Sequence, residues 1–452
     1  METIAGLATG NTTAGISIIR VSGDKSLEIA KKLIHKELPW EPRQLYLTDV
    51  TDGNISDKSL VVYYKAPCSF TGEDVVEFQI HGGMALANAI LTALLDRGAR
   101  MCLPGEFSKR AFLNGRASLD ALEGTVDIIN AQSEAELKAG YNLLIGTLKN
   151  KTDAIQSKLT DTLAAIDVAL DYPEEDIEYE TTEHITNQIV EVQNEIQALV
   201  DSSKTGLLIS NGINVAIVGK PNVGKSSLLN GLLSYERAIV TDVAGTTRDT
   251  LQETYVYEGI KVNLIDTAGI HESQDKVERI GIERSVQALN EAHLILLVID
   301  SSRELNDEDY NIIDLCTKQT KQIIVAINKS DISKDTSKYV DKIKTLLPSA
   351  IILVTSAQDN DSIISIKKTI KSLCVNDDFN SNSLFITNTR HLTCLKSANQ
   401  KLSEALAVIH DVSLDLVSIY LKDSWQDLGE ITGKVITEEV LDTIFSKFCL
   451  GK

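Results

Sequence analysis

The chain has 452 residues, enough for two to four domains that each bury a core of their own. Its formal net charge of −20 argues against a broadly basic nucleic-acid-binding surface and against binding to anionic membranes, although a local basic patch remains compatible with it. The six cysteines form no C-x-x-C pair or metal-binding spacing, and there is neither a signal-peptide pattern nor an apolar run long enough to span a bilayer, so we expect reduced thiols and a cytosolic location.

Residues 1–118 predict a mixed α/β domain. Its clearest predicted elements are three strands and one helix, at residues 14–23, 59–65, 74–80 and 84–96. His81-Gly82-Gly83 lies between a strand and a helix, where glycine permits close backbone approach to a ligand, although an ordinary turn is the simpler interpretation. The run 104–110 predicts another turn, with local positive charge.

From about residue 119 the pattern becomes helical. Apolar residues recur every three or four positions in two stretches, from Ile155 to Leu170 and from Ile185 to Leu199. Between these amphipathic helices lies the acidic, proline-containing segment 171–176, which we interpret as a solvated connection, with a metal site as the alternative. Two long helices joined by a short turn predict an antiparallel pair.

A second α/β pattern occupies residues 209–375, where strand-like runs alternate with helical stretches, as in a doubly wound parallel sheet. The predicted strands lie at 214–218, 260–265, 294–300, 322–327 and 351–355. Helices resume beyond a polar gap and continue to the end of the chain. Because helices flank this domain on both sides, we interpret it as inserted into a helical domain made of residues 119–208 and 376–452.

The segment Gly219–Ser226 follows an apolar strand and precedes a helix, and it has the sequence G-x-x-x-x-G-K-S of a phosphate-binding loop. Backbone amides of such a loop surround phosphate oxygens, and the helix N-terminus adds a partial positive charge. We expect Lys225 to reach the β- and γ-phosphates and the Ser226 hydroxyl to ligate Mg²⁺. The nucleotide-binding residues predicted in this loop and the following turn are Asn222, Val223, Gly224, Lys225, Ser226 and Ser227.

Three further motifs specify the nucleotide. In the motif Asp266–Gly269 we expect the aspartate to hold Mg²⁺ through water and the glycine amide to face the γ-phosphate. In Asn328-Lys329-Ser330-Asp331, the Asp331 carboxylate can accept two hydrogen bonds from guanine, whereas adenine offers neither donor. The segment Thr355-Ser356-Ala357 follows the next strand and can present a backbone N–H to guanine O6. These motifs predict GTP as the ligand, with contacts from Asn328, Lys329, Asp331, Ser356 and Ala357.

The segment 241–249 occupies the position of a switch in which a threonine ligates Mg²⁺ once a γ-phosphate is present, and Thr247 is the first choice and Thr246 the second. Ile270 stands where Ras-like GTPases place the glutamine that orients the attacking water. Catalysis therefore needs another water-positioning group and another positive charge. The nearby candidates, among which the residues alone do not decide, are Glu272, Asp275, Glu278 and Arg279; an acidic stretch without a catalytic role is the alternative.

Several stretches form a distinctive set. They are residues 72–78, 81–83, 104–107 and 110–115 near the N-terminus, 245–249 and 277–283 in the nucleotide domain, and the terminal Phe448-Cys449-Leu450-Gly451-Lys452. Over essentially its full length the chain thereby resembles the MnmE (TrmE) family of tRNA-modification GTPases. The GTPase motifs are shared by many GTPases, whereas the N-terminal stretches and the terminal C-x-G-K are specific to this family.

The resemblance implies a K⁺-dependent GTPase that acts on tRNA together with the flavoprotein MnmG, in a heterotetramer. The two proteins add an aminomethyl or carboxymethylaminomethyl group to C5 of the wobble uridine, and a reduced folate (5-formyl- or methylene-tetrahydrofolate) supplies the one-carbon unit. The N-terminal domain is expected to bind the folate and to form a homodimer. GTP hydrolysis is expected to open and close the two nucleotide domains, which pair when K⁺ is present.

The resemblance also assigns residues in the nucleotide domain. The K⁺ ligands it implies are the side chains of Asn222 and Thr246 and the backbones of Thr241 and Val243. A monovalent cation there neutralises charge between the β- and γ-phosphates, where other GTPases use an arginine. The family's water-orienting glutamate falls on Glu278, which joins Lys225 and Asn222 as the expected catalytic residues.

The folate contacts implied by the family are Arg20, Glu77, Arg116 and Lys452. A carboxylate suits the N–H groups of a pterin ring, and cations suit a glutamyl tail. Cys449 matches a terminal cysteine that the family requires for modification. Since the chain is acidic, we expect the partner flavoprotein to supply much of the tRNA-binding surface.

The sequence thus predicts a multidomain α/β plus α-helical chain: an N-terminal α/β domain, a helical domain, and an inserted Ras-like P-loop domain at residues 209–375. A GTPase for ribosome assembly is a competing interpretation, but it predicts an appended basic, Gly-rich RNA-binding module, and the C-terminal stretch is helical and carries no such motif. A nucleotide-gated scaffold with negligible turnover is a third, and complete GTPase motifs argue against it.

Overall fold

The computed structural model describes residues 2–171, 178–234, 252–266, 288–333, 335–374, 383–448 and 451. The chain forms two compact units. The first contains Met1–Val126, Leu143–Ile185 and Ala407–Lys452, and the second contains Asp127–Asn142 and Thr186–Leu406. Within the described ranges, every helix is too short or too polar to cross a membrane.

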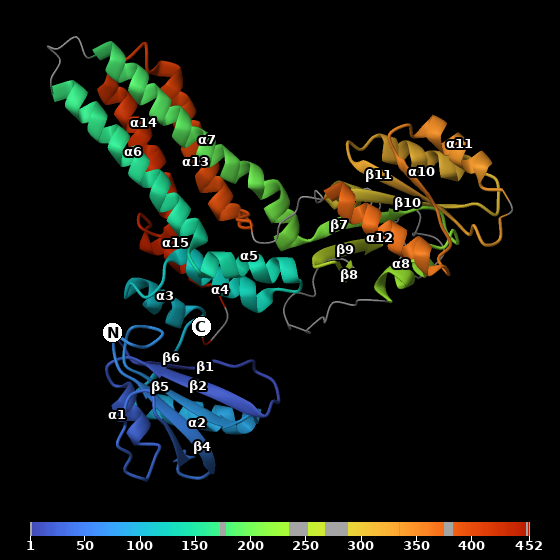
Figure 1. The fold of residues 1–452 in the computed structure, drawn as a ribbon. Helices are drawn as coiled ribbons and strands as arrows, with labels where there is room; N and C mark the ends of the chain where they lie inside the picture. Colours follow the sequence, from blue (N-terminus) through green and yellow to red (C-terminus); the bar gives the residue numbers. More distant parts are fainter. Residues whose placement is uncertain are drawn as a thin grey trace. The chain divides into compact units, whose positions relative to one another are not determined.

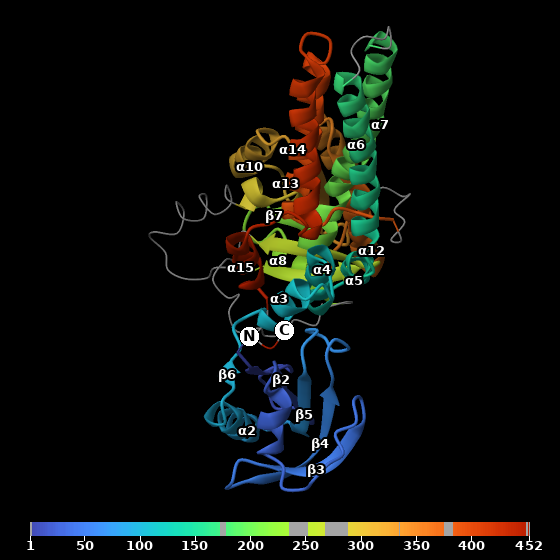
Figure 2. The same ribbon diagram turned by 90° about the vertical axis from the view of Figure 1, so that its left-hand side faces the viewer.

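The first unit contains a six-stranded sheet in the order β3-β4-β5-β2-β1-β6. The strands are β1 (Ile4–Leu7), β2 (Ile16–Ser22), β3 (Leu45–Thr51), β4 (Ser56–Tyr64), β5 (Val75–His81) and β6 (Arg100–Met101). All neighbours are antiparallel except β1 and β6. Alternate residues of β2 and β5, such as Ile19 and Phe78, form a core with helices α1 (Ser26–Lys31) and α2 (Met84–Asp96), and Figure 2 shows α2 beside the sheet.

The helices of the first unit bring the end of the chain back to its beginning. Helix α6 (Thr147–Asp171) packs along α14 (Leu414–Thr432), and Gln156 Nε2 donates to the Trp425 carbonyl at 2.8 Å. Helix α15 (Glu438–Phe445) packs on α3 (Glu106–Leu113), with the Phe112 and Phe445 ring centroids 6.3 Å apart. The predicted connection at 171–176 lies outside the described residues beyond Asp171, so the antiparallel pairing of the two predicted helices stays a prediction.

The second unit contains a six-stranded sheet in the order β12-β11-β10-β7-β9-β8, parallel except for the edge strand β8. The strands are β7 (Ile213–Val218), β8 (Gln252–Tyr257), β9 (Ile260–Asp266), β10 (Leu294–Asp300), β11 (Gln322–Asn328) and β12 (Ile351–Val354). Both faces are covered, because β7 and β10 send alternate residues into two separate cores. The five strands predicted from the sequence are therefore present, and β8 is an additional one.

Helices α8 (Lys225–Leu233) and α12 (Asn360–Cys374) cover one face of this second sheet, and α10 (Asp307–Thr317) and α11 (Ser337–Leu346) cover the other (Figure 1). Helices α7 (Glu178–Asn211) and α13 (Thr389–Val408) lie side by side, and Asn399 donates to Gln197 at 2.7 Å. Helices α4 (Leu119–Asn130) and α5 (Glu134–Leu144) follow the N-terminal segment along the chain and precede α6. The domain boundaries at residues 118, 208 and 375 stay predictions.

Candidate functional site

Five parallel strands of the second sheet end at one edge, and the predicted nucleotide motifs follow them there. β7 runs into Gly219, β9 ends at Asp266, β11 ends at Asn328, and Thr355 follows β12. Ligands of open α/β sheets bind at the carboxyl ends of the strands. The topology thus gathers four sequence motifs, which lie between residues 219 and 357, at the same edge.

Residues 219–226 are called here the nucleotide loop. Two glycines permit its backbone conformation. Gly219 has φ +152°, and a Cβ there lies 2.5 Å from the Val298 carbonyl oxygen of β10. Gly224 has φ +100°, and a Cβ there overlaps Asn328 Nδ2. Only glycine fits both the left-handed backbone and the absence of space, so the G-x-x-x-x-G spacing is a packing requirement of this sheet edge.

The Lys225 ammonium lies over the nucleotide loop. Nζ donates to the carbonyl oxygens of Gly219 and Lys220, at 2.7 Å in both cases, and the side chain is buried. The next two residues, Ser226 and Ser227, are exposed in the first turn of α8. A buried cation inside the loop and hydroxyls at the helix N-terminus are the groups that a bound polyphosphate with its metal ion requires.

Asn328 joins the two loops that are predicted to hold the phosphates and the base. Its side chain is 1% exposed; Nδ2 donates to the Val223 carbonyl at 2.9 Å, and Oδ1 accepts from the Ala357 amide at 3.1 Å. The Ser356 amide donates to Ser362 Oγ at 3.2 Å. Both amides proposed for guanine O6 therefore have protein partners in this structure, whereas Asp331 is exposed to solvent.

The predicted folate contacts cluster on the N-terminal sheet. Arg20 and Glu77 face each other across β2 and β5, and Arg20 Nη2 lies 2.7 Å from Glu77 Oε1. The Arg20 guanidinium lies 5.1 Å from the Phe70 ring centroid. A Cβ on Gly72 lies 3.2 Å from Arg116 Cγ, so the exposed Arg116 covers the same loop. Three of the four predicted residues are thus brought together around residues 70–72.

Several of the distinctive N-terminal residues have a structural role instead. Arg110 is buried and donates to Glu73 Oε2 at 2.9 Å and to Glu106 Oε1 at 3.0 Å. Ser22 Oγ donates to Glu73 at 2.7 Å, and Arg100 Nη2 donates to Glu106 at 2.6 Å. Burial raises the pKa of Glu106, but hydrogen bonds, led by that from Arg100, outweigh burial and hold the pKa below its ordinary value. This ionic network fixes α3 to the sheet.

At the His81-Gly82-Gly83 turn, glycine permits a close backbone approach, but the neighbour is another segment of this chain and not a ligand. A Cβ on Gly82 overlaps the Ala14 carbonyl oxygen, and the Ala14 amide donates to the Gly82 carbonyl at 3.0 Å. His81 Nδ1 lies 2.6 Å from Asp57 Oδ1. The absence of a side chain at Gly82 therefore lets the segment before β2 pack against this turn. Arg20 lies on β2 itself.

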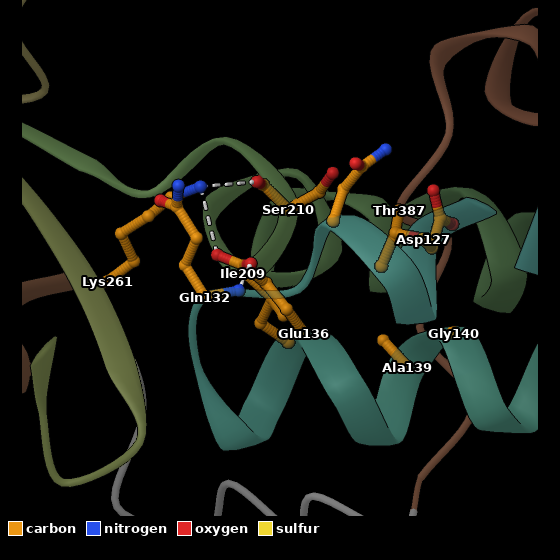
Figure 3. Close-up of a pocket in the computed structure, with 10 residues that line it drawn as sticks. Asp127, Gln132, Glu136, Ala139, Gly140, Ile209, Ser210, Lys261 and Thr387 are labelled. Carbon is orange, nitrogen blue, oxygen red and sulfur yellow. Dashed lines mark hydrogen bonds and ion pairs between the residues drawn. The ribbon is translucent and has the colours of Figure 1, made fainter. Parts of the chain in front are cut away.

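A polar pocket of about 180 Å³ lies at the other end of β9 from Asp266 (Figure 3). Lys261 Nζ lies 3.0 Å from Glu136 Oε1 and donates to the Ser210 carbonyl at 3.2 Å, while the Gln132 amide donates to Glu136 Oε2 at 2.7 Å. None of the predicted nucleotide contacts lines this pocket. We interpret it as a buried ionic joint between α5 and β9.

Comparison with known protein families shows to which family the chain belongs. A family model described as the GTP-binding protein TrmE N-terminus matches residues 3–116, and one described as the MnmE helical domain matches residues 119–449. The chain belongs to the MnmE family. Membership of this family confirms the predicted resemblance, the multidomain fold class and the enzyme class, a GTP hydrolase.

Curated members of the MnmE family match the whole chain. The tRNA modification GTPase MnmE of Lactobacillus johnsonii is 42% identical over 100% of this chain and 98% of that protein, and the protein of the same name from Clostridioides difficile is 39% identical over 100% and 99%. Among solved structures, Aquifex aeolicus Era bound to GDP and AlF4⁻ is 30% identical over 41% of this chain and 65% of that chain, with a TM-score of 0.30.

Some residues predicted from the nucleotide motifs or from the MnmE resemblance lie outside the described part of the chain. They are Thr241, Val243, Thr246, Thr247, Gly269, Glu278, Cys449 and Lys452, together with the side chain of Asp266. Their roles stay predictions. Conversely, the structure shows a contact to the nucleotide loop that the sequence interpretation missed: Arg303 Nη2 donates to the Pro221 carbonyl, and the Arg303 guanidinium is paired with Asp300. The available signal was a charged residue, Asp300, at the last position of a fully buried apolar strand, the position that Asn328 occupies in β11.

Proposed function

We propose that this chain is a cytoplasmic, K⁺-dependent GTPase that acts with the flavoprotein MnmG in a heterotetramer to modify C5 of the wobble uridine in tRNA. The observation that carries the GTPase site is the nucleotide loop, with Lys225 seated on its carbonyls and Asn328 joining it to the base-side loop. Family membership supports the reaction and the tRNA substrate.

Magnesium fits the residues that the structure describes. A hard divalent cation prefers oxygen ligands, and the Ser226 hydroxyl is exposed in the first turn of α8 beside the loop. Thr247 and, through water, Asp266 are the other proposed groups. The ion, when bound, neutralises charge on the β- and γ-phosphates. The chain itself contributes the Lys225 cation and the helix N-terminus to the same task.

A potassium site beside the phosphates is proposed at Asn222. This residue is exposed in the nucleotide loop and has φ +64°, a left-handed conformation that non-glycine residues adopt at a cost. Asparagine adopts this conformation more readily than other non-glycine residues, and its exposed side-chain oxygen is a suitable cation ligand. The Thr246 side chain and the backbones of Thr241 and Val243 complete the proposed ligands, and Glu278 is the proposed water-orienting residue.

Turnover in K⁺ and in Na⁺ at equal ionic strength tests this proposal. We expect GTP hydrolysis at least about tenfold faster in K⁺, since one charge-assisted interaction in the transition state contributes about 1.5–3 kcal/mol. Asn222→Ala is expected to remove that difference. Asn230→Ala, an exposed asparagine on α8, is the matched control and is expected to retain it. Equal rates of the unaltered protein in the two salts contradict the cation site.

The N-terminal sheet is the proposed folate site. The Arg20–Glu77 pair supplies one carboxylate and one cation, and Arg116 supplies a second cation. The C-terminal end of the chain reaches this sheet, because Gly451 packs on the Leu7 carbonyl oxygen. β1 is the neighbour of β2, which carries Arg20. Roles for Cys449 and Lys452 at this site are part of the proposal, and both residues lie outside the described part of the chain.

Glu77→Gln tests the folate site. The amide keeps the shape of the side chain but loses the charge that a pterin ring requires, so we expect affinity for 5-formyltetrahydrofolate to fall at least about tenfold. Titration calorimetry measures the affinity, and thermal melting reports on the sheet. Glu28→Gln, an exposed glutamate on α1, is the control. Unchanged folate affinity in Glu77→Gln rules out this carboxylate as the pterin partner.

The same sheet supports the proposed homodimer. Rows of paired residues place Leu45, Leu47 and Leu60 on the face that carries Arg20 and Glu77, opposite the helix-covered core. These three leucines are exposed. An open apolar sheet face of this kind is typical of a protein–protein interface. We propose that a second copy of the chain covers it, next to the folate site.

A further inference from the structure

The carbonyl groups of five consecutive residues in the nucleotide loop are each held by a side chain. Lys225 Nζ donates to the first two, the carbonyls of Gly219 and Lys220. Arg303 Nη2 donates to the Pro221 carbonyl at 3.2 Å, and Lys329 Nζ donates to the Asn222 carbonyl at 3.0 Å. Asn328 holds Val223. Because these carbonyl oxygens already accept hydrogen bonds from side chains, the backbone N–H groups of the loop are the groups that can bind an anion.

Two of these donors share one carboxylate. Asp300 Oδ2 lies 2.9 Å from Lys329 Nζ and 3.3 Å from Arg303 Nε. Oδ1 accepts from the amide and the hydroxyl of Ser302, at 2.9 and 2.6 Å. Asp300 is only 4% exposed, and every face of its carboxylate has a donor. Burial raises its pKa, but the hydrogen bonds from Lys329 and Ser302 outweigh burial and hold the pKa below its ordinary value.

The segment after β10 also contacts the nucleotide loop at Lys220, the residue before Pro221. The buried Lys220 Nζ donates to Asn306 Oδ1 at 2.6 Å and to Asp309 Oδ2 at 2.8 Å. Asn306 and Asp309 form the capping box of α10, so this contact is anchored to a helix N-terminus. Tyr339 Oη donates to the Arg303 carbonyl at 2.9 Å and fixes the backbone of that residue.

We propose that Asp300 is a positioning residue for the nucleotide site. Through Arg303 and Lys329 it fixes the carbonyls of Pro221 and Asn222 and thereby holds Asn222 in its left-handed conformation. What Asn222 then binds rests on the proposed function, whereas the placement of the loop does not. The residue acts through two others and has no contact with substrate of its own.

This role is separable from a purely structural one. The Arg303 side chain is 45% exposed, so release of its guanidinium to water costs the fold little. Asn222, in contrast, occupies a left-handed backbone conformation that residues with a side chain adopt only where the surrounding contacts favour it. When the carbonyl on either side of it is no longer held, that residue relaxes. The loss therefore falls on nucleotide binding more than on folding.

The test measures the dissociation constant of fluorescent GDP and the K⁺ concentration for half-maximal GTP turnover, in the full-length protein. We expect affinity for GDP to fall about tenfold in Asp300→Asn and about threefold in Arg303→Gln. Arg303→Lys retains a cation and is expected to rescue most of the affinity. Asp314→Asn, an exposed aspartate on α10, is the matched control and is expected to be unchanged. The half-maximal K⁺ concentration is expected to rise together with the dissociation constant.

The double variant Asp300→Asn/Arg303→Gln is expected to bind GDP no more weakly than Asp300→Asn, because both changes remove one arrangement. Unchanged affinity in Asp300→Asn with a lower melting temperature overturns the proposal. Additive losses in the double variant also contradict it. If Asp300→Asn does not fold, Arg303→Gln and Arg303→Lys decide. If the unaltered protein binds GDP but its GTP turnover does not depend on K⁺, the proposed function is contradicted. The GDP dissociation constants of the variants still decide the role of Asp300.

Discussion

Replacement of Gly224 with alanine is expected to weaken GTP binding by about 100-fold. An alanine there pays about 1–2 kcal/mol for the left-handed backbone at φ +100°. Its Cβ also displaces Asn328, whose buried amide joins Val223 to Ala357, and loss of such hydrogen bonds costs about 1–3 kcal/mol. The sum, about 3 kcal/mol, corresponds to two orders of magnitude in a dissociation constant. Fluorescent GDP and GTP titrations measure it.

A matched control separates the strain of the backbone from the collision. Gly259, in the β8–β9 turn, has φ +78°, and a Cβ there meets its nearest atom at 3.6 Å. Gly259→Ala therefore carries the same kind of conformational cost in the same domain, without touching Asn328. We expect it to lower the melting temperature and to leave nucleotide affinity within about twofold. Equal losses of affinity in the two variants contradict the proposed collision with Asn328.

The parallel sheet could be predicted because its central strands are continuous apolar runs. Residues 294–299 and 323–327 needed no partner to be recognised, since strands buried on both faces of an α/β sheet carry no polar alternation. The edge strand β8 was missed, because its sequence QETYVY mixes polar and aromatic residues. β1 and β3 were missed too: β1 is only four residues long, and β3 exposes Leu45 and Leu47 on the open face.

The candidate nucleotide site was predicted as a list of motifs, but not as a set of contacts. Spacing identifies Lys225 and Asn328, because their chemistry belongs to a local pattern. It does not reveal that Asp300 joins Arg303 to Lys329, since those three residues come from two strand ends, and their contact depends on the order β11-β10-β7 in the sheet. Likewise, the distinctive Glu73 and Arg110 form a structural network through contacts 37 residues apart. Long-range pairing of this kind follows from topology rather than from local sequence.

Replacement of Gly451 with alanine is expected to separate modification from GTP hydrolysis. Gly451 has φ +87°, and a Cβ there overlaps the Leu7 carbonyl oxygen and lies 3.0 Å from Ala8 Cα. The left-handed strain and the overlap together exceed about 2 kcal/mol. We therefore expect the C-terminal segment to leave β1, with at least a tenfold loss of folate affinity and of wobble-uridine modification. GTP turnover, whose site belongs to the second unit, is expected to stay within about twofold.

The contrast with Gly98 makes this expectation specific. Gly98 also belongs to the N-terminal segment and has φ +107°, but a Cβ there has no atom within 4 Å. Gly98→Ala thus tests strain without displacement of the terminus, and we expect folate binding and modification to persist. If Gly451→Ala retains both, the contact with Leu7 does not serve the proposed folate site. If it loses both but also loses GTP turnover, the C-terminal segment acts on the whole enzyme. Loss of folate affinity and of modification, with turnover intact, is the result that ties the C-terminal end of the chain to the proposed folate site on the N-terminal sheet.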